Sequence, residues 1–164
     1  MLWHRDHRAC YLQCGTLGAR DGDRSGAGQI ATARRKDRRG LVDHRIGNAS
    51  ETGFEPDTFD RVVIALALHE MPRELRISTL REAARVCRTS GRVVAVEHAR
   101  LSSRWASFLR SLWWFTWVPG NPEASTSADL QQQGLVYEMS RARLRVIETR
   151  TTKPEWIEGA TAEP

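Results

Sequence analysis

Two histidines in the chain directly follow apolar segments that could form buried strands. His69 comes after residues 61–68, and His98 comes after residues 92–97. An imidazole can accept or deliver a proton near neutral pH, so either side chain could act as a general base or hold a substrate. The alternative for each is a loop histidine with only local hydrogen bonds. That alternative is favoured for His98, whereas for His69 the two interpretations are balanced.

Two carboxylates accompany these histidines. Glu70 is adjacent to His69, and Glu97 ends the second apolar segment. Ligands of open α/β sheets bind beyond the carboxyl ends of the strands, so both groups are expected near the same edge. Glu97 should either contact the pocket there or pair with an arginine.

The N-terminal residues contain a cramped set of possible metal ligands. His4, His7, Cys10 and Cys14 follow the pattern H-x2-H-x2-C-x3-C. Structural zinc sites usually place a loop between two ligand pairs, whereas these four residues follow one another closely, with no second half separated by a loop. We therefore predict no metal site. Cys87 lies on the apolar side of an expected helix and is interpreted as a core residue.

Composition limits the classes of protein that need to be considered. The chain has 164 residues, of which 40% are hydrophobic and 27% charged, which is typical of one globular domain. Three cysteines do not make a disulfide scaffold, and no secretory pattern opens the chain, so a cytoplasmic protein is expected. No apolar run approaches the length of a membrane-spanning helix.

The positive charge is concentrated at one end of the chain. Residues 1–40 carry nine Arg or Lys and four Asp or Glu, and residues 41–164 carry sixteen of each. Of the 25 basic residues only Lys36 and Lys153 are lysine, which indicates a GC-rich coding sequence rather than phosphate recognition. We therefore predict no nucleic-acid partner.

Strands and helices are expected to alternate through most of the chain. Strands are predicted over 42–47, 61–67, 92–97, 143–149 and 155–160, and helices over 29–39, 73–88 and 128–141. The first helix should turn Ile30, Ala31 and Ala33 inward. This alternation is typical of a parallel α/β sheet, with 61–67 buried on both faces. Residues 1–29 contain no Val, Ile or Phe, so no core strand is expected there.

An aromatic helix is predicted over residues 103–118. Its tryptophans at 113, 114 and 117 cannot all face the same direction, so at least one ring should meet substrate, solvent or a partner. Trp113 and Trp117 are the candidate substrate-binding residues. The helix could cover a pocket for a lipid-like acceptor, rest on a membrane surface, or pack on the sheet. We favour a pocket or a partner slightly.

A long ordered series of motifs resembles the central half of a known enzyme family. It runs from Gly47-Asn48-Ala49 through Phe54-Glu55-Pro56-Asp57-Thr58-Phe59-Asp60 and Leu68-His69-Glu70-Met71 to Arg85-Val86-Cys87-Arg88-Thr89-Ser90-Gly91. These residues resemble class I S-adenosylmethionine-dependent methyltransferases, most closely the ubiquinone/menaquinone-biosynthesis group. The resemblance covers about residues 29–150. It implies a Rossmann-like, three-layer sheet.

The resemblance also implies roles for individual residues. Asn48 and Ala49 would lie at the adenine end of S-adenosylmethionine, where the Asn48 side chain could bind the adenine amine. Ala65 would line the methionine part of the cofactor at a strand end. His69 would face cofactor or substrate and is the candidate catalytic residue. His98 is a candidate substrate-binding residue.

The family's first motif is missing from this sequence. Residues 1–28 supply neither the glycine-rich turn nor the acidic residue that binds the ribose hydroxyls; Cys14-Gly15-Thr16-Leu17-Gly18 is a poor match with no strand before it. When residues 1–28 are back-translated into degenerate codons and the codons are read one nucleotide later, the new reading frame permits both motifs. We therefore hypothesise that residues 1–28 are an irregular, out-of-frame segment before a methyltransferase-like domain over 29–164. Strands 42–47 and 61–67 would then lose neighbours, which predicts a marginal fold and weak cofactor binding.

Three functions follow from these observations. The first is methyl transfer to a small or lipid-like, quinone-like acceptor, by a chain that could form a homodimer or be inactive. The second is a non-catalytic remnant that binds a partner through its sheet edge and aromatic helix. The third is a zinc or nucleic-acid module, which the neutral body of the chain disfavours.

Overall fold

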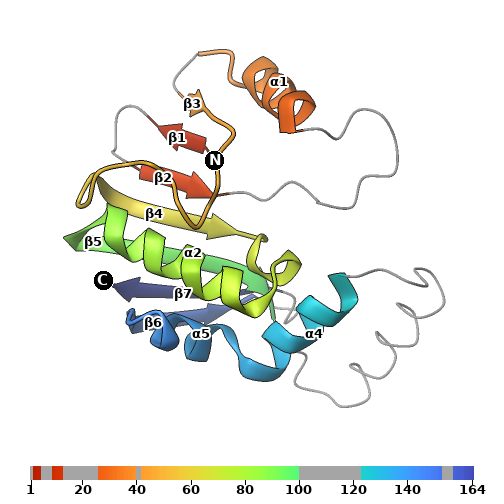
Figure 1. The fold of residues 1–164 in the computed structure, drawn as a ribbon, viewed down its shortest axis with the longest axis vertical. Helices are drawn as coiled ribbons and strands as arrows, with labels where there is room; N and C mark the ends of the chain where they lie inside the picture. The colour runs from red at the N-terminus through yellow and green to blue at the C-terminus, as the bar shows by residue number, and fades with distance from the viewer. Residues whose placement is uncertain (1, 5–8, 13–25, 40–41, 100–122, 153–156) are drawn as a thin grey trace.

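The strands form one mixed sheet. The computed structural model describes residues 2–4, 9–12, 26–39, 42–99, 123–152 and 157–164 (Figure 1). The sheet has seven strands in the order β3-β1-β2-β4-β5-β7-β6. Their bounds are β1 Leu2–His4, β2 Ala9–Leu12, β3 Val42–His44, β4 Phe59–Ala65, β5 Cys87–His98, β6 Arg145–Thr151 and β7 Ile157–Glu163. Because β2, β4 and β5 are parallel neighbours, the predicted α/β class is confirmed.

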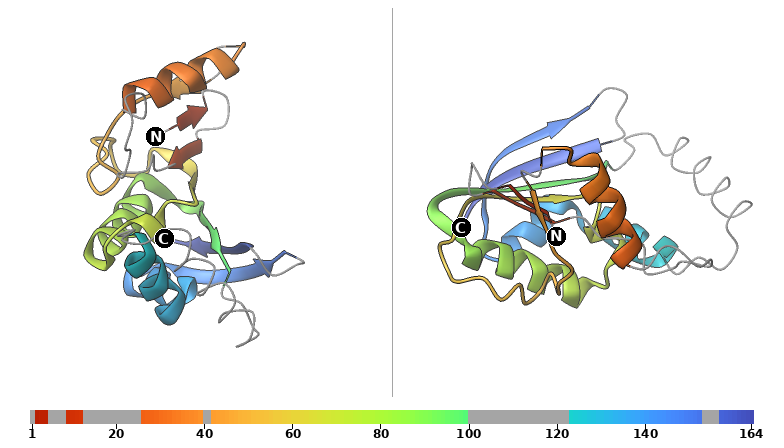
Figure 2. Two further views of the ribbon diagram at one scale, coloured as in Figure 1. Left: turned by 90° about the vertical axis from the view of Figure 1, so that its right-hand side faces the viewer. Right: turned by 90° about the horizontal axis from the view of Figure 1, so that it is seen from above.

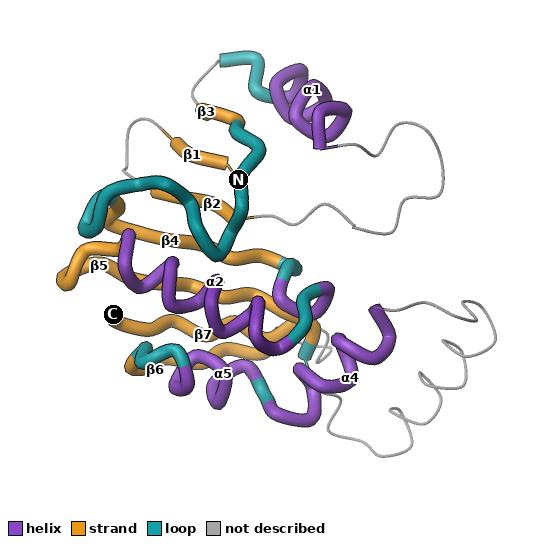
Figure 3. The backbone as a smooth tube through the Cα atoms, in the orientation of Figure 1, coloured by secondary structure: helices purple, strands orange, loops and turns teal. Residues whose placement is uncertain are grey.

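The helices gather mostly on one face of the sheet. They are α1 Gly26–Lys36, α2 Arg73–Val86, α4 Glu123–Gln133, α5 Leu135–Arg141 and the 3-10 helix η1 Leu68–Glu70. Figures 2 and 3 show α2, α4 and α5 on the same side of β4, β5 and β7, with α1 beside β3 at the far end. The core lies between this helical layer and the sheet, and Phe59, Ile64, Leu80 and Met139 are fully buried in it.

Strand β4 is less deeply covered than its sequence predicted. Val62 and Ile64 are fully buried, whereas Val63 and Ala65 on the alternate face are half-buried. The expected burial on both faces is therefore wrong for this strand. The predicted inward face of the first helix is also wrong at Ala31, which is exposed.

The N-terminal residues contain two strands that sequence analysis did not predict. β2 pairs with β4 over four residues, from Ala9↔Arg61 to Leu12↔Ile64, and β1 pairs with β3. The expectation that β3 and β4 lack neighbours is therefore wrong. The ladder is made by backbone groups, so short segments without Val or Ile can fill these positions.

Strand β1 runs against both of its neighbours. It is antiparallel to β2 and to β3. Only residues 5–8 separate β1 from β2, and a parallel crossover needs about a dozen residues or more. The two strands therefore form a hairpin without a crossover helix. Since β2 ends at Leu12, the glycine-containing segment 14–18 does follow a strand, contrary to expectation; the segment itself lies outside the described residues.

Helix α2 provides most of the helical cover over the sheet. Pro72 precedes its first turn with extended backbone, and the helix ends where Cys87 becomes extended. Its buried face contains Thr79, Leu80, Ala83 and Val86, and two charged residues that sequence analysis had not placed there, Arg76 and Glu82. The predicted apolar stripe is thus confirmed at Leu80 and Ala83, while Leu75 and Ala84 are only half-buried.

Arg76 is the centre of a buried polar network. Its Nη1 donates to the backbone oxygens of Met71 (2.9 Å) and Thr126 (3.2 Å), and its Nη2 donates to Asp129 and to Glu138 Oε1 (3.2 Å for the latter). Both Arg76 and Glu138 are fully buried. Among the described residues, Arg76 Nε and Glu138 Oε2 have no hydrogen-bond partner. This network joins α2, α4, α5 and the end of η1.

Two glycines determine local geometry. Gly134 has φ +88°, a left-handed conformation that divides the predicted single helix over 128–141 into α4 and α5. Gly91 lies in the irregular start of β5, where a Cβ atom would be 2.7 Å from Asp60 O and 2.9 Å from Arg88 O. A turn expected from the sequence at Ser90-Gly91 does not form, because β5 continues through both residues; the close backbone there requires glycine at position 91.

The thiol of Cys87 belongs to the core. The residue is 2% exposed, which confirms its predicted role, and burial raises its pKa to about 11. Among the helices that the structure describes, none is long and apolar enough to cross a membrane.

Candidate functional site

The carboxyl ends of β4 and β5 form the best-defined edge of the sheet. Ala65 pairs with Val96 as the last residue of β4, and the next backbone N–H, that of Leu66, donates to Val96 O at 2.8 Å. Leu66 has φ 50° and is 38% exposed. A large residue in the left-handed region is uncommon and strained, and such strain gathers at functional sites. The edge predicted for cofactor binding is thus also the strained part of β4.

Glu97 ties the two strand ends together. Its carboxylate is 2% exposed, and Oε1 accepts hydrogen bonds from the backbone N–H groups of Ala67 (2.9 Å) and Leu68 (2.6 Å). Those donors begin η1 and would otherwise be buried without a partner. Glu97 therefore fixes the turn after β4; the expected pairing with an arginine is not found among its described contacts.

His69 completes this arrangement. Its Nδ1 lies 2.8 Å from Glu97 Oε2, and Thr126 Oγ1 of α4 donates to its backbone oxygen at 2.7 Å. Glu97 Oε2 is an acceptor, so we assign the Nδ1–H tautomer, which leaves Nε2 as the basic nitrogen. Nε2 is 4.0 Å from Glu70 Oε1. A carboxylate-oriented imidazole of this kind can accept a proton.

His98 lies beside His69. Their ring centroids are 5.0 Å apart in an edge-on arrangement, and the His98 side chain is exposed. A cavity of about 260 Å³ adjoins His98 and is lined by Glu97, His98, Glu158 and the C-terminal end of α4. Glu97 thus lines a cavity, and its contact with a cofactor or substrate pocket stays a prediction. Ala65, His69 and His98 are brought together at one edge, as their positions after strands required.

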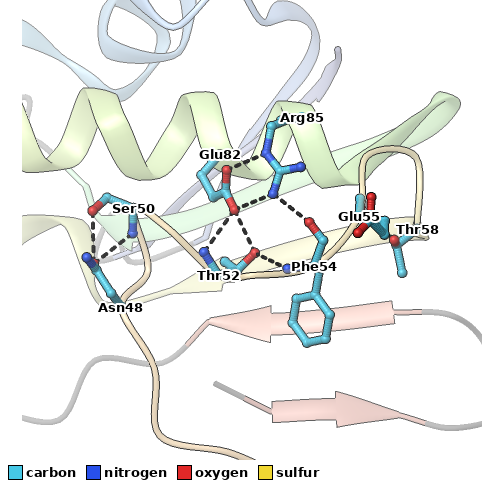
Figure 4. Close-up of polar contacts among 8 residues, drawn as sticks. All are labelled: Asn48, Ser50, Thr52, Phe54, Glu55, Thr58, Glu82 and Arg85. Atoms are coloured by element: carbon cyan, nitrogen blue, oxygen red, sulfur yellow. Dashed lines mark hydrogen bonds and ion pairs between the residues drawn. The ribbon is translucent and has the colours of Figure 1, made fainter.

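Asn48 and Ala49 lie on a different segment, the loop after β3. Asn48 Oδ1 accepts hydrogen bonds from the backbone N–H and the hydroxyl of Ser50, at 3.1 and 2.9 Å (Figure 4). Both lone pairs of that oxygen are then in use. Binding of an adenine amine by Asn48 requires a change in this turn, and the role stays a prediction. Ala49 is half-buried against the core.

A polar cluster anchors the same loop to α2. Glu82 Oε1 accepts from Thr52 N–H (2.9 Å) and Thr52 Oγ1 (2.6 Å), and Arg85 contacts both carboxylate oxygens at 2.7 Å (Figure 4). Arg85 Nη2 also donates to Phe54 O. Hydrogen bonds from Arg85 lower the pKa of Glu82 to about 2, with Thr52 contributing. Sequence analysis missed this cluster, although Glu82 and Arg85 are three residues apart, a spacing that brings side chains together on a helix.

The Glu82 cluster predicts a pH dependence of stability. Because the folded pKa of about 2 lies below the ordinary value of 4.5, the stabilisation is complete above about pH 4.5 and is lost as pH falls toward 2. A shift of this size corresponds to roughly 2–4 kcal/mol. We expect Glu82→Gln to lower the unfolding free energy at pH 7 and to flatten its decline between pH 4.5 and 2, as measured by urea denaturation at each pH.

Glu74→Gln is the matched control. Glu74 is an exposed carboxylate on the same helix, and it is not part of the Glu82 cluster. An equally steep decline in the Glu82 and Glu74 variants would contradict the assignment.

Several predicted residues cannot be placed at this site. Trp113 and Trp117, and the whole aromatic segment 103–118, lie outside the described residues, as do His7 and Cys14 of the possible zinc pattern. In the part of the chain that the structure does describe, no group of three His, Cys, Asp or Glu could hold a metal ion.

Comparison with known proteins shows what this chain is similar to. Residues 24–95 match the family described as Methyltransferase domain. A ubiquinone/menaquinone biosynthesis C-methyltransferase from Bartonella tribocorum is 32% identical over 79 residues, covering 48% of this chain and 30% of that protein. The chain thus spans about a third of the length of this curated relative.

Solved structures share the fold at low sequence identity. A SAM-dependent methyltransferase from Methanosarcina mazei has a TM-score of 0.60 and 16% identity, covering 97% of this chain and 92% of its own. A geranyl diphosphate C-methyltransferase from Streptomyces coelicolor, in complex with Mg²⁺, geranyl diphosphate and S-adenosyl-L-homocysteine, has a TM-score of 0.58 and 12% identity, covering 98% and 74%. At these identities the likeness concerns the fold.

Proposed function

We propose that the β4–β5 edge of this chain binds S-adenosylmethionine and supports methyl transfer to a small or lipid-like acceptor, because residues 24–95 match the methyltransferase-domain family. The observation that carries this proposal is the joined edge itself. Glu97 holds the turn after β4 and orients His69, and the strained Leu66 lies between the end of β4 and His69 in the chain. Ligands of open α/β sheets bind at such an edge.

The residues present fit one end of the cofactor better than the other. Ala65 and Leu66 offer a backbone-rich strand end for the methionine part. By contrast, β1 and β2 contain no Asp or Glu to bind the ribose hydroxyls. Hydrogen bonds to a charged group contribute about 1.5–3 kcal/mol each. Without two such hydrogen bonds to the ribose hydroxyls, the affinity for S-adenosylmethionine should be lower by about two orders of magnitude or more.

The chain's own residues would contribute orientation and proton transfer. S-adenosylmethionine, when bound, supplies a methyl group already activated on sulfur, so alignment of the acceptor provides much of the rate enhancement. His69, oriented through Nδ1, would take a proton at Nε2 from an acceptor that must lose one. Glu97 acts through His69 and is a positioning residue.

Cofactor binding tests the proposal directly. We expect calorimetric titration with S-adenosylmethionine to give a dissociation constant on the order of 100 μM or weaker. Photo-cross-linking of radiolabelled cofactor should label the chain, and Ala65→Phe, which fills the edge, should remove the label. Ile147→Phe adds the same ring on the exposed part of β6 and should have no effect.

A chain that is not labelled at millimolar cofactor would overturn the proposal, as would equal labelling of the folded Ala65 variant and the wild type. Circular dichroism melts establish that both variants are folded. Micromolar affinity would instead contradict the weakened ribose contact while leaving the site in place.

We also propose that residues 1–28 are read out of frame from a methyltransferase gene. The hairpin of β1 and β2 supports this, because neighbouring strands of a cofactor-binding unit are parallel, whereas β1 runs antiparallel to both of its neighbours. The coding DNA upstream of the Gln29 codon decides the matter. A shifted frame without a glycine turn and an aspartate would eliminate the idea.

The partner-binding alternative has less support. β6 is an edge strand with Ile147 exposed, as a docking edge would need. However, a register irregularity falls at Ile147, between Val146 and Glu148, and charged Arg145 and Arg150 flank it. Bulges and charges are the means by which sheets prevent edge pairing.

A further inference from the structure

The cavity beside His98 has a small volume and a distinctive lining. It measures about 260 Å³ and is bounded by Glu97 and His98 of β5, Glu158 of β7, Leu135 of α5 and the C-terminal end of α4. Pockets for drug-sized ligands range from about 300 to 1,000 Å³. The occupant must therefore be a small molecule rather than a long lipid or quinone.

The described lining favours positive charge. Glu97 and Glu158 are paired across the β5–β7 ladder, and both line the cavity. The last carbonyl groups of α4 add the partial negative charge of a helix C-terminus, and its last turn has no basic residue. None of the lining residues that the structure describes is Lys or Arg. Since Glu97 already accepts hydrogen bonds from two backbone N–H groups and contacts His69, Glu158 is the carboxylate available to a ligand.

Charge and geometry exclude two kinds of occupant. Among the described residues no group of three His, Cys, Asp or Glu could hold a metal ion, so they offer a metal ion no ligand set here. An anion such as the geranyl diphosphate in the Streptomyces coelicolor structure would find no basic partner among the described lining residues. A polar organic cation remains, with a body small enough to contact Leu130 and Leu135.

We propose that this cavity binds a small organic amine and, if the proposed function holds, that this amine is the methyl acceptor. The ammonium form first gives a proton to the imidazole of His98, which lines the cavity and whose ring contacts that of His69. The nitrogen lone pair then forms the new N–C bond while the C–S bond breaks and its electron pair stays on sulfur. The products are an N-methylated ammonium ion and S-adenosylhomocysteine.

Three probes of matched shape and different charge test the cavity. Benzylamine, benzyl alcohol and benzoate are titrated into the full ¹⁵N-labelled chain without S-adenosylmethionine. We expect benzylamine to shift the amide resonances of His98 and of residues 131–135, and to bind at least about tenfold more tightly than benzoate. Benzyl alcohol should fall between them.

A variant pair isolates the carboxylate. Glu158→Gln should weaken benzylamine binding about fivefold and leave benzyl alcohol unchanged. Glu148→Gln, an exposed carboxylate on β6, should change neither. The proposal is overturned if benzoate binds as tightly as benzylamine, if the shifted resonances lie elsewhere, if Glu158→Gln has no effect, or if no probe binds at millimolar concentration. Because no cofactor is present, these results are independent of whether S-adenosylmethionine binds.

Discussion

Replacing Arg76 with methionine is expected to lower the free energy of unfolding by about 3–5 kcal/mol. Arg76 is fully buried and supplies the hydrogen bond to Glu138 Oε1 at 3.2 Å. Without it, the equally buried Glu138 keeps, among the contacts of the described residues, the longer one with Arg73 at 3.6 Å. An uncompensated buried carboxylate is the main source of the expected loss.

A double variant separates the buried charge from the packing. Arg76→Met combined with Glu138→Leu removes both charges, and we expect its stability to return to within about 1–2 kcal/mol of the wild type. Urea denaturation of the two single variants and the double variant completes the cycle. Losses that simply add in the double variant would show that the two side chains are not coupled.

The second large effect is expected at Gly91. Gly91→Ala places a Cβ atom within 2.7 Å of Asp60 O, 2.9 Å of Arg88 O and 2.7 Å of Cys87 Sγ. Two of these atoms belong to the backbone, so the strand start must move to accept the methyl group. We expect a loss of about 3 kcal/mol in unfolding free energy, measured by urea or thermal denaturation.

Gly159→Ala is the matched control in the same sheet. Its added Cβ would meet nothing closer than 3.9 Å, from Ala95 O and Arg150 O. The change should therefore stay within about 1 kcal/mol of the wild type. Equal losses at Gly91 and Gly159 would mean that steric crowding does not explain the requirement at Gly91.

Periodicity predicted the central elements of the fold well. β4, α2 and β5 lie close to their expected positions because apolar residues repeat with strand or helix spacing there. The N-terminal strands were missed because Leu2–His4 and Ala9–Leu12 lack the β-branched residues that mark a core strand. Gly134 was missed as a break because its positive φ depends on tertiary packing rather than on a turn motif.

The candidate site was predictable in location and less so in contacts. His69 and His98 follow parallel strands, and the carboxyl ends of such strands meet at one edge. The backbone hydrogen bonds of Glu97 were not predictable, since they depend on the turn at Ala67 and Leu68. Arg76 and Glu82 were missed because a charged residue is assigned to the solvent side unless its partner is known, and their partners are up to 62 residues away.

The sheet consists of two parts that should differ in stability: the short strands β1, β2 and β3, and the longer strands β4, β5, β7 and β6. The hairpin with β3 consists of strands of three, four and three residues, whereas β4, β5, β7 and β6 have seven, twelve, seven and seven. The two parts share one ladder of four residue pairs between β2 and β4. The N-terminal part should therefore open by sub-global unfolding while the larger part stays folded. The edge that carries His69 and Glu97 would then stay folded while β1, β2 and β3 are unfolded.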